Sequence, residues 1–377
     1  MKLKPLLINK KHHDGFKLSL WEKLHLDLPL LFGLSLLIGL GMLILYSAGG
    51  KSLVFLSQQA MRLGLAAAIM VILAQIPPQT YRFWAPWLYT LGVVLLVAVL
   101  VLGVIGKGAQ RWLNLGLFRF QPSELLKLAL PMFLASYFAD KPLPPKLSQI
   151  ALASLFILIP ALLVAKQPDL GTAILIAGAG FCVLLLAGIR WRLLLILTAG
   201  VMAVAPLLWH FLKDYQRQRV LTFLDPERDP LGSGYHIIQS KIAIGSGGLF
   251  GKGWLQGTQS HLNFLPEHAT DFIFAVCGEE FGLMGGLVLL SIYVFIIVRC
   301  LQIAMRAQDT FSRLLAGSLA LSFFLYVFIN IGMVSGVLPV VGVPLPLISY
   351  GGTSMVTLMA SFGILMSVQT HRRLVAA

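Results

Sequence analysis

Three acidic side chains stand where apolar stretches of the chain begin, so each could carry out acid–base chemistry at the end of a helix. Glu124 and Asp169 each come shortly after a Gln-Pro pair, and Asp271 follows Thr270. Proline at the first helical position with an acid in the first turn is ordinary helix-start chemistry, so capping alone could explain Glu124 and Asp169. Lys127 lies one helical turn after Glu124, which predicts an ion pair on one helix face.

Asp271 differs from the other two because it stands between a polar loop and the apolar run 272–276. Partial desolvation at such a place raises the pKa of a carboxyl group and with it the basicity. A carboxylate of this kind could accept a proton from a sugar hydroxyl. A plain N-cap role explains the local sequence equally well, so both interpretations stay open.

Several basic residues could meet an anionic group such as a pyrophosphate. Lys252 lies in the glycine-rich stretch 245–253, whose backbone N–H groups could cradle a phosphate. The stretch lacks Walker A spacing, and plain turns are the alternative. Arg111, which precedes a tryptophan, and the pair Arg217 and Arg219 are further candidates; for Arg111 an interfacial anchor is the alternative.

The elements that must position these residues are membrane helices. Hydrophobic residues make up 58% of the 377 residues, only 12% are charged, and the mean hydropathy is +0.85. A soluble globule averages about 25% charged residues. Apolar runs of roughly 20 residues, the length that crosses a bilayer, recur along the chain. The fold class predicted is an all-α polytopic membrane protein with ten spans: 28–47, 53–75, 86–105, 122–139, 148–165, 168–187, 193–211, 282–299, 312–334 and 350–369.

The placement of positive charge predicts the orientation. Residues 1–27 carry six lysines without the apolar core of a signal peptide, which predicts a cytoplasmic tail and a retained first span. Lysine and arginine are concentrated in this tail, in the C-terminal tail and in the even-numbered loops, which follow the second, fourth, sixth and eighth predicted spans. The positive-inside rule expects this distribution. We therefore expect both termini in the cytoplasm and all three carboxylates at the outer face. The net charge of +14 then reflects topology and predicts no nucleic-acid partner.

Two segments should behave neither as spans nor as short loops. A large extracytoplasmic loop is predicted at 212–281, between the seventh and eighth spans. Its last part, Asp271–Phe281, is expected to be a short interfacial helix that keeps Glu279 and Glu280 near water. The glycine- and proline-punctuated apolar segment 335–349 cannot form a regular helix, and we expect it to wall a groove. One domain over 1–377 is predicted, without an inverted repeat of the transporter type. The three cysteines predict no disulfide framework.

These motifs, taken in order, resemble the SEDS family, and most closely its RodA-type elongation branch. The resemblance covers nearly the whole chain. Its carriers are Lys107–Leu113, Gln121–Glu124, Gln167–Thr172, Asp229–His236, Ile242–Gly248, Leu265–Glu267, Thr270–Phe272, Pro344–Pro346 and Ser349–Gly352, with Gly251–Trp254 and Gly257–Ser260 typical of the elongation branch.

The resemblance implies a glycosyltransferase that polymerises lipid II outside the bacterial cytoplasmic (inner) membrane. Asp271 matches the family's essential aspartate, while Glu124, Lys127 and Asp169 match polar residues of its central cavity. Arg111, Lys252 and Ser349 lie in the motifs and are further candidates for substrate binding. Two positions depart from the family pattern: Ala269 stands where histidine is common, and Thr353 where serine is usual.

The implied mechanism has Asp271 as general base on the 4-hydroxyl of the acceptor N-acetylglucosamine, with undecaprenyl pyrophosphate as leaving group and inversion at the anomeric carbon. The departing pyrophosphate needs positive charge from Lys or Arg or from a divalent cation, and the sequence predicts no specific metal ligands. A class B penicillin-binding protein is the implied partner, and the polyprenyl tail would occupy the apolar groove. A lipid II flippase is the main alternative, and a non-catalytic scaffold of wall synthesis is a third.

Overall fold

The computed structural model describes residues 24–106, 109–114, 119–196, 199–200, 202–203, 214–225, 233–258 and 269–371. Most of the predicted N-terminal tail, most of the predicted span 193–211 and the motif at 265–267 lie outside these residues. Residues 226–232 and 259–268 of the predicted large loop also lie outside them. Lys107 and the side chain of Arg219 also fall outside what the structure describes.

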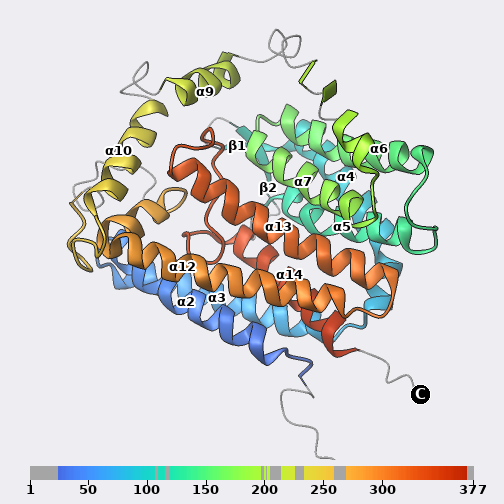
Figure 1. The fold of residues 1–377 in the computed structure, drawn as a ribbon, viewed down its shortest axis with the longest axis horizontal. Coiled ribbons are helices and arrows are strands. Elements are labelled where there is room, and N and C mark those ends of the chain that lie inside the picture. Colours follow the sequence, from blue (N-terminus) through green and yellow to red (C-terminus); the bar gives the residue numbers. More distant parts are fainter. Residues whose placement is uncertain are drawn as a thin grey trace, which may run out of the picture.

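Every predicted span within the described residues has a helix at its place (Figure 1). The helices are α2 (Leu28–Ala48), α3 (Leu53–Ala74), α4 (Pro78–Leu102), α5 (Pro122–Ala139), α6 (Leu147–Lys166), α7 (Leu170–Leu186), α9 (Asp214–Leu224), α10 (Ser233–Ser246), α12 (Ile273–Met305), α13 (Thr310–Val334) and α14 (Thr353–Thr370). Seven described helices are long and apolar enough to cross a membrane, and α7 is a shorter apolar helix. The polytopic helical prediction is confirmed.

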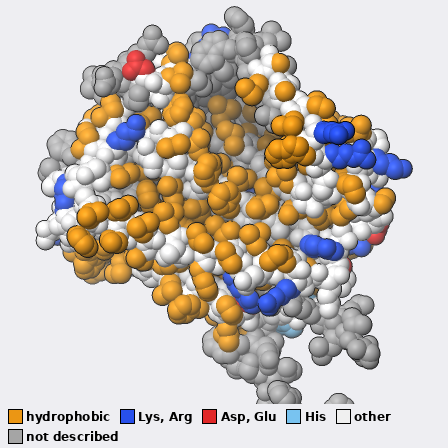
Figure 2. All heavy atoms as spheres, viewed as in Figure 1, with side chains coloured by type: hydrophobic (Ala, Val, Ile, Leu, Met, Phe, Trp, Pro, Cys, Tyr) orange, Lys and Arg blue, Asp and Glu red, His pale blue; other side chains and the backbone are white. Residues whose placement is uncertain are grey.

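The outer surface of the bundle is apolar in the way that contact with lipid requires. Large side chains such as Phe32, Trp87 and Val101 are 61%, 71% and 76% exposed. Figure 2 shows hydrophobic side chains spread over the middle of one face, with Lys and Arg mostly towards its margins. Such a surface suits a hydrocarbon environment, because soluble proteins rarely expose large contiguous apolar areas.

Helices α13 and α14 form the interior of the bundle. Two-thirds (67%) of the apolar stretch of each is buried, against 22–39% for the other spanning candidates. Helix α13 contacts α5, α7 and α12, and α14 packs along α3. Figure 1 shows α4 to α7 on one side of the bundle and α2, α3 and α12 on the other. The central helices can therefore carry residues from one side to meet residues from the other.

The first and last described residues lie at the same end of the bundle. The rings of His25, before α2, and His371, after α14, stack with centroids 4.1 Å apart and planes 8° apart. We call this end the termini end. The opposite end, where α5, α7, α12 and α14 begin, is called the site end. A chain that enters and leaves at one end crosses an even number of times, as the predicted topology requires.

A small antiparallel sheet at the site end was not predicted. Strands β1 (Val104–Gly106), β2 (Ala109–Asn114) and β3 (Arg119–Phe120) lie in the order β1-β2-β3 between α4 and α5. Strands β1 and β3 are too short to show an alternating pattern in the sequence, and β2 does not alternate strictly between apolar and polar residues. Helix α4 also begins at Pro78, before the predicted start at 86, because Pro86 lies inside the helix instead of opening it.

Helix α12 breaks where the glycines predicted it. Gly282 has φ 64° and ψ −160°, a conformation that side chains rarely adopt, so a short helix 273–281 precedes the long one. The expectation that Glu279 and Glu280 stay near water is wrong, because they are 0% and 1% exposed. They are buried against protein, where hydrogen bonds replace the water they would otherwise need. The three cysteines are buried and free, as expected.

Candidate active site

Asp271 occupies the turn that leads into α12, and its backbone is fixed by two other parts of the chain. The side-chain amide of Asn330 on α13 donates to the carbonyl oxygens of Asp271 (2.8 Å) and Val343 (2.7 Å). The hydroxyl of Ser349 donates to the carbonyl oxygen of Thr270 (2.5 Å). Asn330 is fully buried, so these bonds form in a low-dielectric interior where they are strong. The backbone at Asp271 is therefore tied to the segment that carries Val343 and Ser349.

The segment 335–349 lies against both Asp271 and the first turn of α7. Its Gly342 has φ 75°, and a Cβ there would lie 3.5 Å from the Asp271 Oδ2 atom. On the other side, a Cβ on Gly171 of α7 would overlap the carbonyl oxygen of Val341. The prediction that this segment is irregular is confirmed, and it joins the starts of α7 and α12, at Leu170 and Ile273, which are distant in sequence.

Asp169 caps α7 and also holds a cation. Its side chain accepts a hydrogen bond from the backbone of Thr172 (3.2 Å), which confirms the capping interpretation. The Nε atom of Arg111, on β2, lies 3.4 Å from the Asp169 Oδ2 atom, and the Arg111 Nη2 atom donates to the carbonyl oxygen of Pro168 (2.9 Å). The carboxylate is 6% exposed and the guanidinium is more open. The small sheet therefore supplies the partner of a buried carboxylate.

Glu124 and Lys127 form the predicted ion pair. The Lys127 Nζ atom lies 2.7 Å from the Glu124 Oε1 atom, and both side chains are more than nine-tenths buried. The same ammonium lies 5.3 Å from the centre of the Tyr326 ring on α13, within the range of a cation–π contact. Sequence reasoning missed Tyr326 because it lies in a long apolar stretch without a motif.

Helix α13 explains how these groups come together. Tyr326 faces Lys127, and Asn330 holds the backbone of Asp271. The two α13 residues are four positions apart, so they share one face with a rise of about 6 Å between them. The ion pair on α5 and the aspartate before α12 thus approach the same face of one helix. The structure brings Glu124, Lys127 and Asp271 to one part of the site end.

Two predicted site residues serve the protein's own framework. The Ser349 hydroxyl also accepts a hydrogen bond from the backbone N–H of Leu345 (2.8 Å), so it bridges two backbone groups. Lys252 forms an ion pair with Glu279 (2.7 Å), against the short helix that begins α12. Within the described residues, no cluster of three or more His, Cys, Asp or Glu could hold a metal ion.

A large apolar groove lies beside these groups, between α3, α5 and α14. It has a volume of about 680 Å³, with Leu65, Ile69 and Val356 among its walls. Its charged lining residues are Arg62, Arg119 and Glu124. The groove was expected against the segment 335–349. Residues 344–347 and 349 of that segment instead line a small cavity of about 10 Å³. Arg119 was missed because single basic residues at strand ends usually signal topology. Arg62 was missed although a charged residue in the middle of a span, here α3, is itself a signal of a functional site.

A second cavity, at the termini end, has a different character. Its volume is about 350 Å³, and it lies where α4 and α13 begin and α14 ends. Arg82, Gln308, Asp309 and His371 are among its lining residues. Polar groups therefore surround the hollow at the termini end, whereas the groove at the site end is mainly apolar.

Comparison with known proteins gives consistent results over nearly the whole chain. Residues 22–374 match the FtsW/RodA/SpoVE family model, described as cell cycle protein. The peptidoglycan glycosyltransferase MrdB of Escherichia coli is 55% identical over 361 residues, which cover 96% of this chain and 98% of MrdB.

Two solved structures agree with the fold. A chain from a study of the structural coordination of polymerization and crosslinking by a peptidoglycan synthase complex superposes with a TM-score of 0.80 at 36% identity. It covers 91% of this chain and 97% of that one. The rod shape determining protein RodA of Thermus thermophilus gives a TM-score of 0.69 at 30% identity, covering 91% of this chain and 96% of RodA.

Proposed function

The chain belongs to the FtsW/RodA/SpoVE family of cell cycle proteins, as its motifs predicted, and from that membership we propose that it is a peptidoglycan glycosyltransferase. It polymerises lipid II into glycan strands at the outer face of the cytoplasmic membrane during cell elongation. The observation that carries the proposal is the 55% identity to a peptidoglycan glycosyltransferase over 96% of the chain.

Asp271 acts as the general base. It takes the proton of the 4-hydroxyl of the acceptor N-acetylglucosamine, and the freed oxygen bonds to the anomeric carbon of the donor glycan. The bond from that carbon to the diphosphate breaks, and undecaprenyl diphosphate leaves with the electron pair. The fixed backbone of Asp271 supports this role, because proton transfer depends on a base held within hydrogen-bond reach of the proton.

The groove between α3, α5 and α14 binds the isoprenoid chain. Its apolar walls suit a hydrocarbon tail, and Arg62 and Arg119 are positioned to balance the negative charge of a diphosphate. Arg62 lies over the Tyr350 ring, 4.5 Å from its centre, which holds the guanidinium in place. Glu124 lines the same groove and its partner Lys127 faces α13, so the groove leads towards the group that contains Asp271.

The protein works beside a transpeptidase that cross-links the new glycan, of the class B penicillin-binding type. The structural relative from a peptidoglycan synthase complex supports such an assembly. Both termini lie in the cytoplasm. The stacked rings of His25 and His371 support the part of this proposal that places the two ends on the same side of the membrane. Asp271, Asp169 and Glu124 then face the outside.

A lipid II flippase is a second candidate, because a transporter needs polar surroundings at both ends of its path. The 350 Å³ cavity with Arg82 and Asp309 at the termini end meets that need. A membrane-sidedness assay of lipid II in proteoliposomes tests it directly. Transfer of lipid II across the bilayer without partner protein or glycan formation would favour the flippase.

Polymerisation of labelled lipid II by the purified protein with its partner tests the glycosyltransferase. Asp271→Asn should lower the rate by about 10²–10⁴-fold, the usual contribution of a general base. Asp140→Asn is the matched control, because Asp140 is 78% exposed and pairs with Arg82 at the termini end. An Asp271→Asn protein that folds normally and polymerises at the wild-type rate would overturn the assignment of the base.

A further inference from the structure

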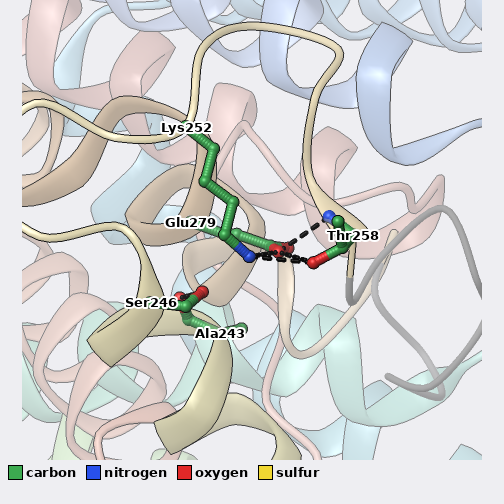
Figure 3. Close-up of polar contacts among 5 residues, drawn as sticks. All are labelled: Ala243, Ser246, Lys252, Thr258 and Glu279. Carbon is green, nitrogen blue, oxygen red and sulfur yellow. Dashed lines mark hydrogen bonds and ion pairs between the residues drawn. The ribbon is translucent and has the colours of Figure 1, made fainter.

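Glu279 is a fully buried carboxylate that holds an outer segment of the chain. Its Oε1 atom accepts hydrogen bonds from the Lys252 Nζ atom (2.7 Å), the Thr258 backbone N–H (2.8 Å) and the Thr258 hydroxyl (3.0 Å). Figure 3 shows the Lys252 and Thr258 side chains converging on this carboxylate. Three donors on one oxygen are what a charged carboxylate needs when it leaves water.

The backbone around Lys252 lies flat against the start of α12. The N–H of Lys252 donates to the carbonyl oxygen of Glu279 and the N–H of Gly253 to that of Glu280, both at 3.0 Å. Gly251 has φ 80°, and a Cβ there would overlap the Glu280 carbonyl oxygen. These N–H groups, which the sequence suggested for a phosphate cradle, are thus engaged with α12.

The short helix 273–281 is held on its other side as well. The Ser47 hydroxyl, at the end of α2, donates to the Glu280 Oε1 atom. Past the break at Gly282, the N–H of Leu283 donates to the carbonyl oxygen of Gly248 (3.0 Å). The helix that follows directly after Asp271 is therefore clamped between α2 and the segment 247–258.

The hydrogen bonds from Lys252 and Thr258 to Glu279, called the clamp here, also bear on the position of Asp271. In the sequence, 12 residues separate Thr258 from Asp271. Glu279 lies eight residues after Asp271, a rise of about 12 Å along a helix. One carboxylate thus holds Thr258 against the short helix that begins two residues after Asp271.

We propose that Glu279 is a positioning residue for the glycosyl transfer, and that its bonds to Lys252 and Thr258 set the position of Asp271 relative to the acceptor sugar. The inference rests on the proposed function of Asp271. Lys252 then acts through Glu279 and does not contact the substrate. A displacement of about 1 Å from the productive geometry costs about 10²-fold in rate, so loss of the clamp is visible in turnover.

The first experiment compares Glu279→Gln and Lys252→Arg with the wild type in lipid II polymerisation with the partner present. Glu279→Gln should lower kcat by about 10–10²-fold and leave KM for lipid II nearly unchanged, because the lipid groove is untouched. Lys252→Arg keeps the charge and should retain most of the activity. Wild-type kcat in a folded Glu279→Gln protein would overturn the proposal.

The second experiment replaces the clamp by a covalent bond. The backbone hydrogen bond between residues 252 and 279 and their meeting side chains give the close approach that a disulfide needs. The double variant Lys252→Cys and Glu279→Cys should have weak polymerase activity when reduced, and this activity should rise at least severalfold on oxidation. The activity of the wild type should not depend on the reductant. Failure to cross-link, or a cross-linked protein as slow as the reduced one, contradicts the clamp.

Hydrogen–deuterium exchange separates this proposal from the proposed function. Glu279→Gln should speed exchange of the segment 247–258 whether or not the protein polymerises lipid II. If the wild type makes no glycan, the function assigned to the family site is wrong, and the clamp is judged by exchange alone. Unchanged exchange in that segment would overturn the clamp.

Discussion

Gly171 faces the carbonyl oxygen of Val341 with no room for a side chain between them. This contact joins the first turn of α7, which Asp169 caps, to the segment that lies against Asp271. Because Gly342, the next residue along, approaches the Asp271 Oδ2 atom, the two carboxylates are connected through a single pair of residues. A change at Gly171 should therefore reach Asp271 without touching it.

Gly171→Ala should lower both stability and polymerase activity. A methyl group at this position has to displace the Val341 backbone, and overpacking of this kind costs about 1–3 kcal/mol. Gly64→Ala on α3 is the matched control, since nothing lies within 4 Å of a Cβ there. Alanine in that helix should be neutral or stabilising by about 0.5–1 kcal/mol. Equal melting temperatures and rates for both variants would mean that the segment 335–349 can shift to make room for the methyl group without cost.

The helical frame could be predicted because each span carries its own signal. A run such as 28–47 is apolar enough to require a bilayer regardless of its neighbours, and α2 begins and ends within one residue of that range. The span predicted at 86–105 starts too late, because α4 begins at Pro78 and contains Pro86, and a helix in lipid tolerates an internal proline.

The site was only partly predictable, because its assembly depends on contacts between distant segments. The pair Glu124–Lys127 follows from helical spacing and was found. Asn330 and Arg62 lie inside apolar spans without a motif. Their roles appear only when α13 meets the segment 335–349 and Arg62 on α3 meets the Tyr350 ring. The burial of Glu279 likewise depends on a partner 27 residues away, so its solvent exposure was predicted wrongly.

Single and double substitutions of Glu124 and Lys127 should show whether this ion pair does more than stabilise the fold. Removing one partner leaves a buried charge uncompensated, so Glu124→Gln and Lys127→Met should each destabilise the protein by about 3–5 kcal/mol. The double variant should regain most of that stability. If the pair also contacts the substrate, the double variant stays slow in polymerisation despite its recovered melting temperature. Recovery of both would assign the pair to the framework alone.

A bulky side chain in the groove should weaken binding of long-chain lipid II more than binding of a short-chain analogue. Val356→Trp narrows the apolar part and should raise KM for lipid II with a full undecaprenyl chain by about tenfold, equivalent to about 1.4 kcal/mol. A lipid II analogue with a short prenyl chain should be little affected. Val294→Trp, on a 56% exposed position of α12, is the matched control. Equal effects on both chain lengths would argue against the isoprenoid assignment.

The stacked histidines at the termini end should make stability depend on pH. Burial, and then the nearby His371 ring, lowers the pKa of His25 below its ordinary value of 6.5. The unfolded chain therefore binds a proton at His25 before the folded protein does, so the contribution is present above pH 6.5 and is lost as pH falls through the lowered pKa. The Nδ1 atom of His25 also meets the Thr370 hydroxyl (3.2 Å), an interaction that glutamine can partly replace. The melting temperature of the wild type should thus fall more steeply between about pH 7.5 and about pH 5 than that of His25→Gln. Parallel pH curves for the two proteins would show that this ring pair does not contribute to acid sensitivity.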